Sequence, residues 1–244
     1  WTEGATLDWE SLPARVEAAI AERIERLPGQ EQELLSVASV EGEEFHAEVA
    51  ARVLGLPNAQ ALAALSGPLG RRHHLVTAQS LHQTGEQVFS RFRFQHHLFQ
   101  RYLYQRLDPI QRAHLHGEIA QALEALGASP TGAPDPLNSF EMLADNSSDL
   151  FTSPRAVASE ATLAWHWEES GLTEKAILWH CHAARKAIWL AFVHAEELRH
   201  TRKILDLAGT LPEGPRRTRW ENLGHLFLGL VLVGDVHPDS LLEE

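Results

Sequence analysis

Two adjacent histidines, His96 and His97, lie where the hydrophobic pattern of the chain changes its period. Residues 86–94 alternate at a period of two, which predicts a half-buried strand. From His96 to Leu107 the apolar residues recur at helical spacing, so a helix is expected to begin at the two histidines. The first N–H groups of a helix, together with the helix dipole, favour an anion. The pattern therefore predicts phosphate-binding geometry at His96 and His97.

The same two histidines have a second interpretation. In it they are junction residues whose ring nitrogens bond to main-chain groups, and no ligand is involved. Arg91 and Arg93 precede them and would add positive charge to a phosphate site. Alternating arginines on a strand also form an ordinary solvated face. The sequence leaves both interpretations open.

The remaining histidines and the single cysteine form no catalytic or metal-binding motif. A helical zinc pair has i, i+4 spacing and a third ligand. That spacing is absent from the close histidine pairs, which are His114 with His116, His180 with His182, and His194 with His200. Cys181 lies in an alanine-rich stretch and is expected in the core. No serine or cysteine nucleophile has a matching base, so we predict no catalytic residue and no metal site.

Residues 1–127 are predicted to form short helices and one hairpin. Apolar spacing and terminating Pro or Gly residues place helices at about 11–27, 31–40, 45–54 and 58–69. A hairpin follows, with strands at 75–81 and 86–94. The helix that begins at His96 is followed by another from Ile110 to about Leu126. Several short helices and then one hairpin are typical of a winged-helix-like domain.

The rest of the chain divides into a linker and a helical domain. Residues 128–153 are rich in Pro, Gly, Ser, Asn and Asp and have no period, which predicts a linker or a poorly ordered loop. Residues 154–244 carry helical stretches joined by short turns, which favours antiparallel neighbours. Trp165 to Gly171, followed by Ala176, resembles the tetratricopeptide (TPR) pattern. We therefore expect a mainly α chain ending in a truncated, TPR-like antiparallel helical array.

Tryptophans concentrate in this C-terminal half. They are interpreted first as packing between helices, and second as the aromatic lining of a groove that holds a peptide or a small ligand. The residues that are candidates for partner binding on the second interpretation are Trp165, Trp167, Trp179, Trp189 and Trp220.

Composition limits the classes of function. The hydrophobic content of 44% and charged content of 22% are those of an ordinary globular protein. One cysteine excludes an internal disulfide, and the longest apolar run is too short to span a bilayer. No secretory signal opens the chain. We expect a cytoplasmic location, no membrane partner, and a piece of a longer protein.

Charge argues against nucleic acid as a partner. The net charge is -12, whereas a phosphate-backbone binder carries a basic stripe. Residues 71–74, Arg-Arg-His-His, form the only dense basic run, and Arg52 is the only Lys or Arg in the two helices predicted at 43–54 and 58–69. A transcription factor that acts through its own winged helix is therefore the least favoured of the binding functions.

The motif around His96 resembles a known family. Phe94-x-His96-x-Leu98, at the start of a helix after a hairpin strand and downstream of a Leu-Pro-x-x-Val-x-x-x-Ile helix at residues 12–20, resembles the winged-helix part of STAND ATPases. These are multidomain signal-transduction relatives of AAA proteins. Within the family's Met-His-Asp motif, His96 matches the histidine that touches the β-phosphate of ADP. His97 replaces the aspartate and Gln95 replaces the methionine.

The resemblance implies a regulatory role without catalysis. This chain contains no Gly-x-x-x-x-Gly-Lys-Ser/Thr, so the ATP or ADP would be held by a nucleotide-binding domain upstream. His96 and His97 would contact the bound ADP, and the helical array would relay a protein or small-ligand signal to the nucleotide state. Exchange to ATP would free the chain to form a homo-oligomer. The alternative is a TPR-type interaction scaffold that works without nucleotide.

Overall fold

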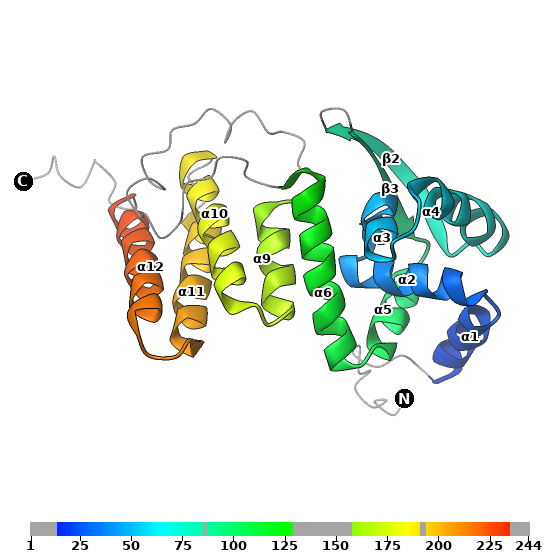
Figure 1. Cartoon of the computed structure of the whole chain (residues 1–244), viewed down its shortest axis with the longest axis horizontal. Coiled ribbons are helices and arrows are strands. Elements are labelled where there is room, and N and C mark those ends of the chain that lie inside the picture. The colour runs from blue at the N-terminus through cyan, green and yellow to red at the C-terminus, as the bar shows by residue number, and fades with distance from the viewer. Residues whose placement is uncertain (1–13, 85–86, 129–157, 191–193, 235–244) are drawn as a thin grey trace, which may run out of the picture. The chain divides into compact units, whose positions relative to one another are not determined.

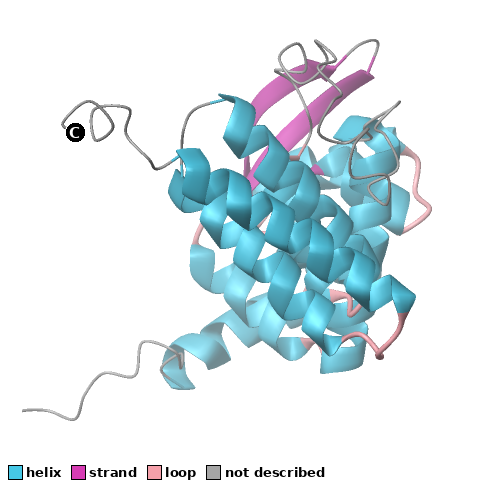
Figure 2. Ribbon diagram, turned by 90° about the vertical axis from the view of Figure 1, so that its left-hand side faces the viewer, coloured by secondary structure: helices cyan, strands magenta, loops and turns pink. Residues whose placement is uncertain are grey.

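A computed structural model describes residues 14–84, 87–128, 158–190 and 194–234. The chain is mainly helical, and its strands belong to one small sheet (Figure 2). The mainly α class predicted from the sequence is thus confirmed. Two compact units make up the chain, Trp1–Leu115 and His116–Glu244, and the boundary falls within helix α6 (Pro109–Leu123). Beyond Ala128, the predicted linker lies outside the described residues.

The first unit combines short helices with a three-stranded antiparallel sheet of strand order β1-β3-β2 (Figure 1). Before the hairpin the chain runs through α1 (Ala14–Glu25), α2 (Gly29–Glu41), β1 (Glu44–His46), α3 (Ala47–Val53), α4 (Asn58–Ala64) and the π-helix η1 (Leu65–Arg72). It continues through β2 (Val76–Thr84), β3 (Gln87–Phe94), α5 (His97–Arg106) and the start of α6. The period change at His96 does mark the passage from strand to helix.

Strand β1 is an element that the sequence pattern did not predict. A helix was expected from Phe45, but α3 begins only at Ala47. The three preceding residues pair with β3, Phe45 lying opposite Phe92. The Phe45 ring is fully buried, stacks on the Phe92 ring and has its centroid 5.2 Å from that of Phe94. These aromatic contacts favour a strand at Phe45 over the helix that the local spacing predicts.

The fourth helix also differs from the expected one. After Ala64 the backbone widens into the π-helix η1, which continues to Arg72 and contains Pro68. A Cβ atom at Gly70 would lie 2.7 Å from the main-chain oxygen of Leu65, closer than real Cβ contacts. Only glycine therefore allows this close approach of the backbone to itself. Arg71 and Arg72 are the last residues of η1 and lie a few residues before the start of β2, the first strand of the hairpin.

The second unit is a row of helices that pack mainly on their neighbours in sequence (Figure 1). It contains the end of α6, the π-helix η2 (Glu124–Ala128), α9 (Glu160–Glu169), α10 (Thr173–Leu190), α11 (His194–Thr210) and α12 (Pro215–Gly234). The Ser159 side chain caps α9 by accepting from Thr162 N. Gly171, at φ 75°, makes the tight turn into α10.

Apolar side chains from three successive helices form the core of this unit. The buried cluster consists of Ile177, Cys181, Ala184, Ile204, Ala208, Trp220, Leu223 and Phe227. Small residues on α10 and α11 allow the helices to approach closely, as the alanine spacing predicted. Within the described ranges, no helix is both long enough and apolar enough to cross a membrane.

Candidate functional site

His96 is the N-cap residue of α5. Its backbone is extended, with φ -143° and ψ 133°, and its Nδ1 atom accepts a hydrogen bond from the N–H of Leu98 at 3.2 Å. An imidazole nitrogen that accepts cannot carry a proton, so the neutral ring holds its hydrogen on Nε2. The capping bond thereby assigns one nitrogen to the helix and leaves an N–H on the other. A single side chain can serve both interpretations drawn from the sequence.

His97 lies beside it at the first position of the helix. Both histidines are exposed, and their ring centroids are 4.7 Å apart. The structure therefore brings together the two residues predicted as phosphate contacts, on a surface that a ligand can reach. They face solvent at the positive end of the α5 dipole.

The hairpin places a second basic segment next to these histidines. Val76, at the start of β2, pairs with Phe94, at the end of β3, and the N–H of Gln95 donates to the oxygen of Leu75 at 2.8 Å. Because antiparallel strands bring the start of one beside the end of the other, residues 71–74 and His96 lie at the same end of the hairpin.

Arg23 joins α1 to this end of the hairpin. Its Nη2 atom donates to the main-chain oxygen of His73, and its guanidinium lies 5.2 Å from the ring centroid of Phe99. Phe99 N donates in turn to the oxygen of His96 at 3.0 Å. We call the group formed by Arg23, Arg72, His73, His96 and His97 the hairpin-base surface. Arg23 was missed in the sequence because it stands 50 positions before His73, with no local motif to link them.

The arginines of β3 do not belong to this surface. Arg93 donates from Nε and Nη2 to Glu43 Oε1 at 2.9 and 2.6 Å, and Arg91 lies 3.5 Å from Glu44. Glu44 lies in β1 opposite Arg93, and Glu43 directly precedes that strand. Cross-strand ion pairing accounts for both arginines.

The tryptophans of the second unit divide by burial. Trp167, Trp179 and Trp220 are buried, whereas Trp165 is 40% exposed and lies edge-on to His116 with ring centroids 4.9 Å apart. The Trp189 side chain lies outside the described residues. Of the four that are described, Trp165 alone offers a partner a substantial surface.

Buried histidines pair between helices of the second unit. Nδ1 of His116 lies 2.9 Å from Nδ1 of His166, and the same distance separates these atoms of His180 and His200. Burial, aided by the paired His116, lowers the pKa of His166 to about 3, and burial lowers the pKa of His200 to about 4. His166 and His200 are therefore neutral at pH 7, and the two histidine pairs connect neighbouring helices.

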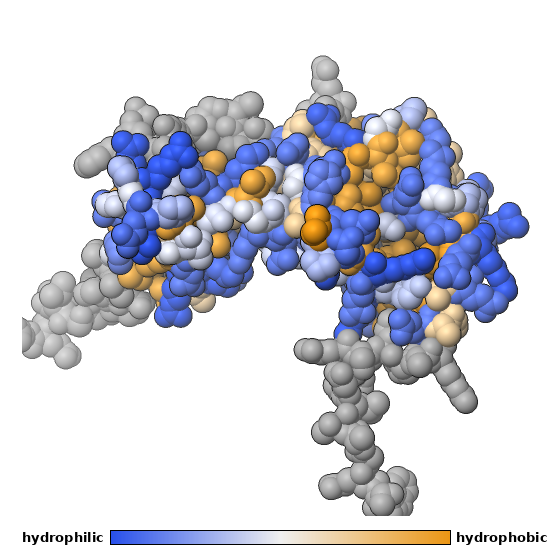
Figure 3. Space-filling model, turned by 60° about the horizontal axis from the view of Figure 1, so that its bottom comes forward, coloured by the Kyte–Doolittle hydropathy of each residue, from blue (hydrophilic) through white to orange (hydrophobic). Residues whose placement is uncertain are grey.

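The described part of the chain contains no group of three or more His, Cys, Asp or Glu side chains arranged to hold a metal ion. Burial also raises the pKa of the Cys181 thiol, which keeps it protonated and unreactive at neutral pH. Hydrophilic residues cover much of the face of the molecule shown in Figure 3.

Comparisons with protein-family models, with curated proteins and with solved structures found no match to this chain. The residues of the hairpin-base surface and the helices that position them are therefore the basis for a functional assignment.

Proposed function

We propose that this chain is the regulatory part of a STAND-type signal-transduction ATPase and acts without catalysis of its own. His96 and His97 of the hairpin-base surface contact the β-phosphate of ADP held by a nucleotide-binding domain of the same protein. The helical second unit receives a protein or small-ligand signal. The contact couples that signal to the nucleotide state.

The order of elements supports a winged-helix assignment for the first unit. Helix α2 is followed by β1, by the helical segments α3, α4 and η1, and then by the hairpin of β2 and β3. Strand β3 lies between β1 and β2 in the sheet. This is the arrangement expected of a winged helix, with the hairpin as the wing.

His96 carries the proposal. A phosphate oxygen accepts hydrogen bonds, and the Nε2–H group of His96 is a donor that the capping bond leaves available. The capping bond to Leu98 fixes the ring at the helix N-terminus, where the dipole favours the phosphate charge. Preorganisation by the cap reduces the entropy lost when the contact forms.

The second unit supports a TPR-like array. Helix α11 begins 34 positions after α9, at His194 against Glu160, and 34 residues is the length of a TPR unit. Each helix of this unit packs mainly on the helices that precede and follow it in the sequence. Repeat proteins gain their stability from such contacts between adjacent repeats. A partner that binds the array more tightly in one nucleotide state than in the other would shift the equilibrium toward the state it prefers. The size of the shift is set by the difference between the two binding free energies.

The test uses the protein with its nucleotide-binding domain included. Bound nucleotide is identified by mass spectrometry, and ADP affinity is then compared among wild type, His96→Asn, His96→Ala and His97→Ala. Asparagine is a strong N-cap but has no donor at the position of Nε2. We expect His96→Asn to weaken ADP binding about tenfold at near-normal stability, as loss of one bond to a charged group does. Unchanged ADP affinity in His96→Asn would refute the contact.

The exposed Trp165 favours a second candidate, a TPR-type scaffold that binds a partner independently of nucleotide. Aromatic side chains with one free face are common anchors at interfaces. This candidate predicts that Trp165→Ala removes partner binding and that His96→Asn has no effect on it at any nucleotide concentration. The proposed switch predicts that His96→Asn alters the nucleotide dependence of the same binding.

A further inference from the structure

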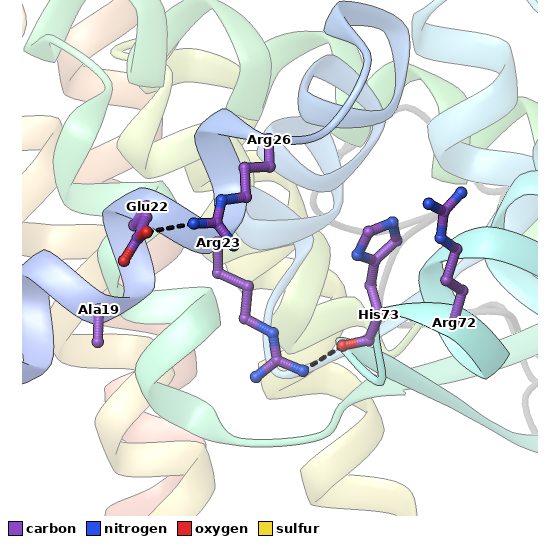
Figure 4. A pocket seen from close by; sticks show the side chains of 6 residues that line it. All are labelled: Ala19, Glu22, Arg23, Arg26, Arg72 and His73. Atoms are coloured by element: carbon purple, nitrogen blue, oxygen red, sulfur yellow. Dashed lines mark hydrogen bonds and ion pairs between the residues drawn. The ribbon is translucent and has the colours of Figure 1, made fainter.

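We propose that the first unit has an anion site of its own, in the open hollow between α1 and the end of η1, and that it takes a phosphate group of a small ligand such as a nucleoside diphosphate. The hollow is lined by Ala19, Glu22, Arg23, Arg26, Arg72 and His73 (Figure 4). We call it the α1–η1 hollow. It shares Arg23, Arg72 and His73 with the hairpin-base surface but does not include His96, the residue that carries the contact proposed above.

Most of the charged side chains that line the α1–η1 hollow are positive. Three arginines and a single carboxylate, Glu22, line it, in a chain whose net charge is -12. Glu22 forms an ion pair with Arg26 (Figure 4). Arg72 is exposed and has no hydrogen-bond or ion-pair partner among the described residues. Two of the three arginines therefore lack a balancing carboxylate in the described structure.

Arg23 is held in position before any ligand arrives. One of its N–H groups donates to the oxygen of His73, and its guanidinium carbon lies over the Phe99 ring, 5.2 Å from the ring centroid. A guanidinium has five N–H donors, so four remain after the bond to His73. Fixing an arginine on a carbonyl and an aromatic ring lowers the entropy lost when it binds an anion.

These donors favour phosphate. Arginine forks match phosphate oxygens in bidentate geometry, and two or three forks together can satisfy a dianion. The hollow has a volume of about 530 Å³, which lies within the range of small-molecule sites. Glu22 on the rim and the acidic balance of the chain would repel a polyanionic strand. A small phosphate ligand is therefore favoured over a nucleic-acid backbone.

The experiment titrates this chain alone with inorganic pyrophosphate and with ADP, following binding by calorimetry and by amide shifts in an NMR spectrum. Arg72→Ala is the informative variant, because its side chain is exposed and unpaired in the described structure and its loss leaves the fold intact. Arg219→Ala is the matched control, an exposed arginine of α12 with the same change in net charge. We expect Arg72→Ala to weaken pyrophosphate binding about tenfold and Arg219→Ala to have little effect.

Each outcome separates this site from the proposed switch. Weakening by Arg72→Ala but not by His96→Asn supports an anion site in the hollow. Equal affinities in Arg72→Ala and Arg219→Ala, or amide shifts confined to residues outside the hollow, would overturn it. Tight, salt-sensitive binding of a duplex oligonucleotide that excludes pyrophosphate would also overturn it, since the ligand would then be a strand. None of these results depends on the nucleotide-binding domain that the proposed function requires.

Discussion

The Nδ1 atom of His96 accepts a hydrogen bond from the N–H of Leu98 and so caps α5. Loss of an N-cap typically lowers protein stability by about 1 kcal/mol. We expect His96→Ala to lower the free energy of unfolding by about that amount and His96→Asn to lower it by less. Urea unfolding followed by circular dichroism measures both. His97→Ala, which removes a ring outside the cap, is the control, and a loss as large as that of His96→Ala would contradict the capping role.

Glu124, in η2 at the start of the helical array, forms hydrogen bonds with two tryptophans. Its Oε1 atom accepts from Nε1 of Trp167 at 2.8 Å and from Nε1 of Trp179 at 2.7 Å. Both indoles are buried, so Glu124→Ala leaves two donors without an acceptor. We expect a loss of about 2–6 kcal/mol in the free energy of unfolding, from roughly 1–3 kcal/mol for each of the two buried unpaired groups.

Glu124→Gln keeps an oxygen in place and should cost less than half as much. Glu169→Gln, an exposed carboxylate on α9, serves as the neutral control. Tryptophan fluorescence during urea unfolding reports both the stability and the environment of the indoles. Equal stability of Glu124→Ala and Glu169→Gln would show that the two hydrogen bonds contribute nothing.

Acid should destabilise the helical array. Burial lowers the pKa of His166 to about 3 and that of His182 to about 4, while the unfolded chain protonates near 6.5. Between those values the unfolded state binds protons that the folded state does not. Stability is therefore full above pH 6.5 and falls as the pH drops toward 4, by roughly 1.4 kcal/mol per pH unit for each histidine.

Neighbouring charges act in the same direction. Burial alone would raise the pKa of Glu168, but the hydrogen bond and charge of Lys203, with help from His180, lower it below its usual range. That carboxylate therefore also loses stabilising interactions on acidification, but only once the pH falls below its unfolded pKa near 4.5, so the histidines dominate above pH 5. Urea midpoints at pH 7.5, 6.0 and 5.0 measure the slope. His166→Gln should reduce it by about one histidine's share, whereas the exposed His225→Gln should leave it unchanged.

Gly70 is required by the backbone of η1. An alanine Cβ would lie 2.7 Å from the Leu65 oxygen, and that oxygen belongs to the main chain and cannot rotate away. We expect Gly70→Ala to lower the free energy of unfolding by about 1–3 kcal/mol, the usual cost of overpacking. Gly209→Ala is the matched control on α11, where nothing lies within 4 Å of the added carbon, and it should be neutral or slightly stabilising. A thermal melt of the two variants distinguishes them.

Periodic elements were accessible from the sequence. The change of period at His96 located the end of β3 and the start of α5, and the alanine spacing on α10 indicated a close helix neighbour. Such signals are local, because each is set by which face of one element is buried. The mainly α class follows from them.

Contacts between distant residues were not accessible. Strand β1 has three residues, too few to show a period, and exists because Phe45 joins the aromatic cluster of β3. The bond from Arg23 to His73 and the pair of His116 and His166 each connect positions 50 apart, and no local motif specifies either. The sequence pattern therefore predicted only part of the candidate site. The change of period located His96 and His97, whereas the place of Arg23 in the site became evident only from the fold.

Cys181 gives the array a built-in chemical reporter. It is the only thiol in 244 residues, and the core of α10, α11 and α12 excludes solvent from it completely. An alkylating reagent can reach it only when these helices separate, so the rate of labelling measures how often the array opens. A signal that tightens the array would slow that rate without any engineered probe.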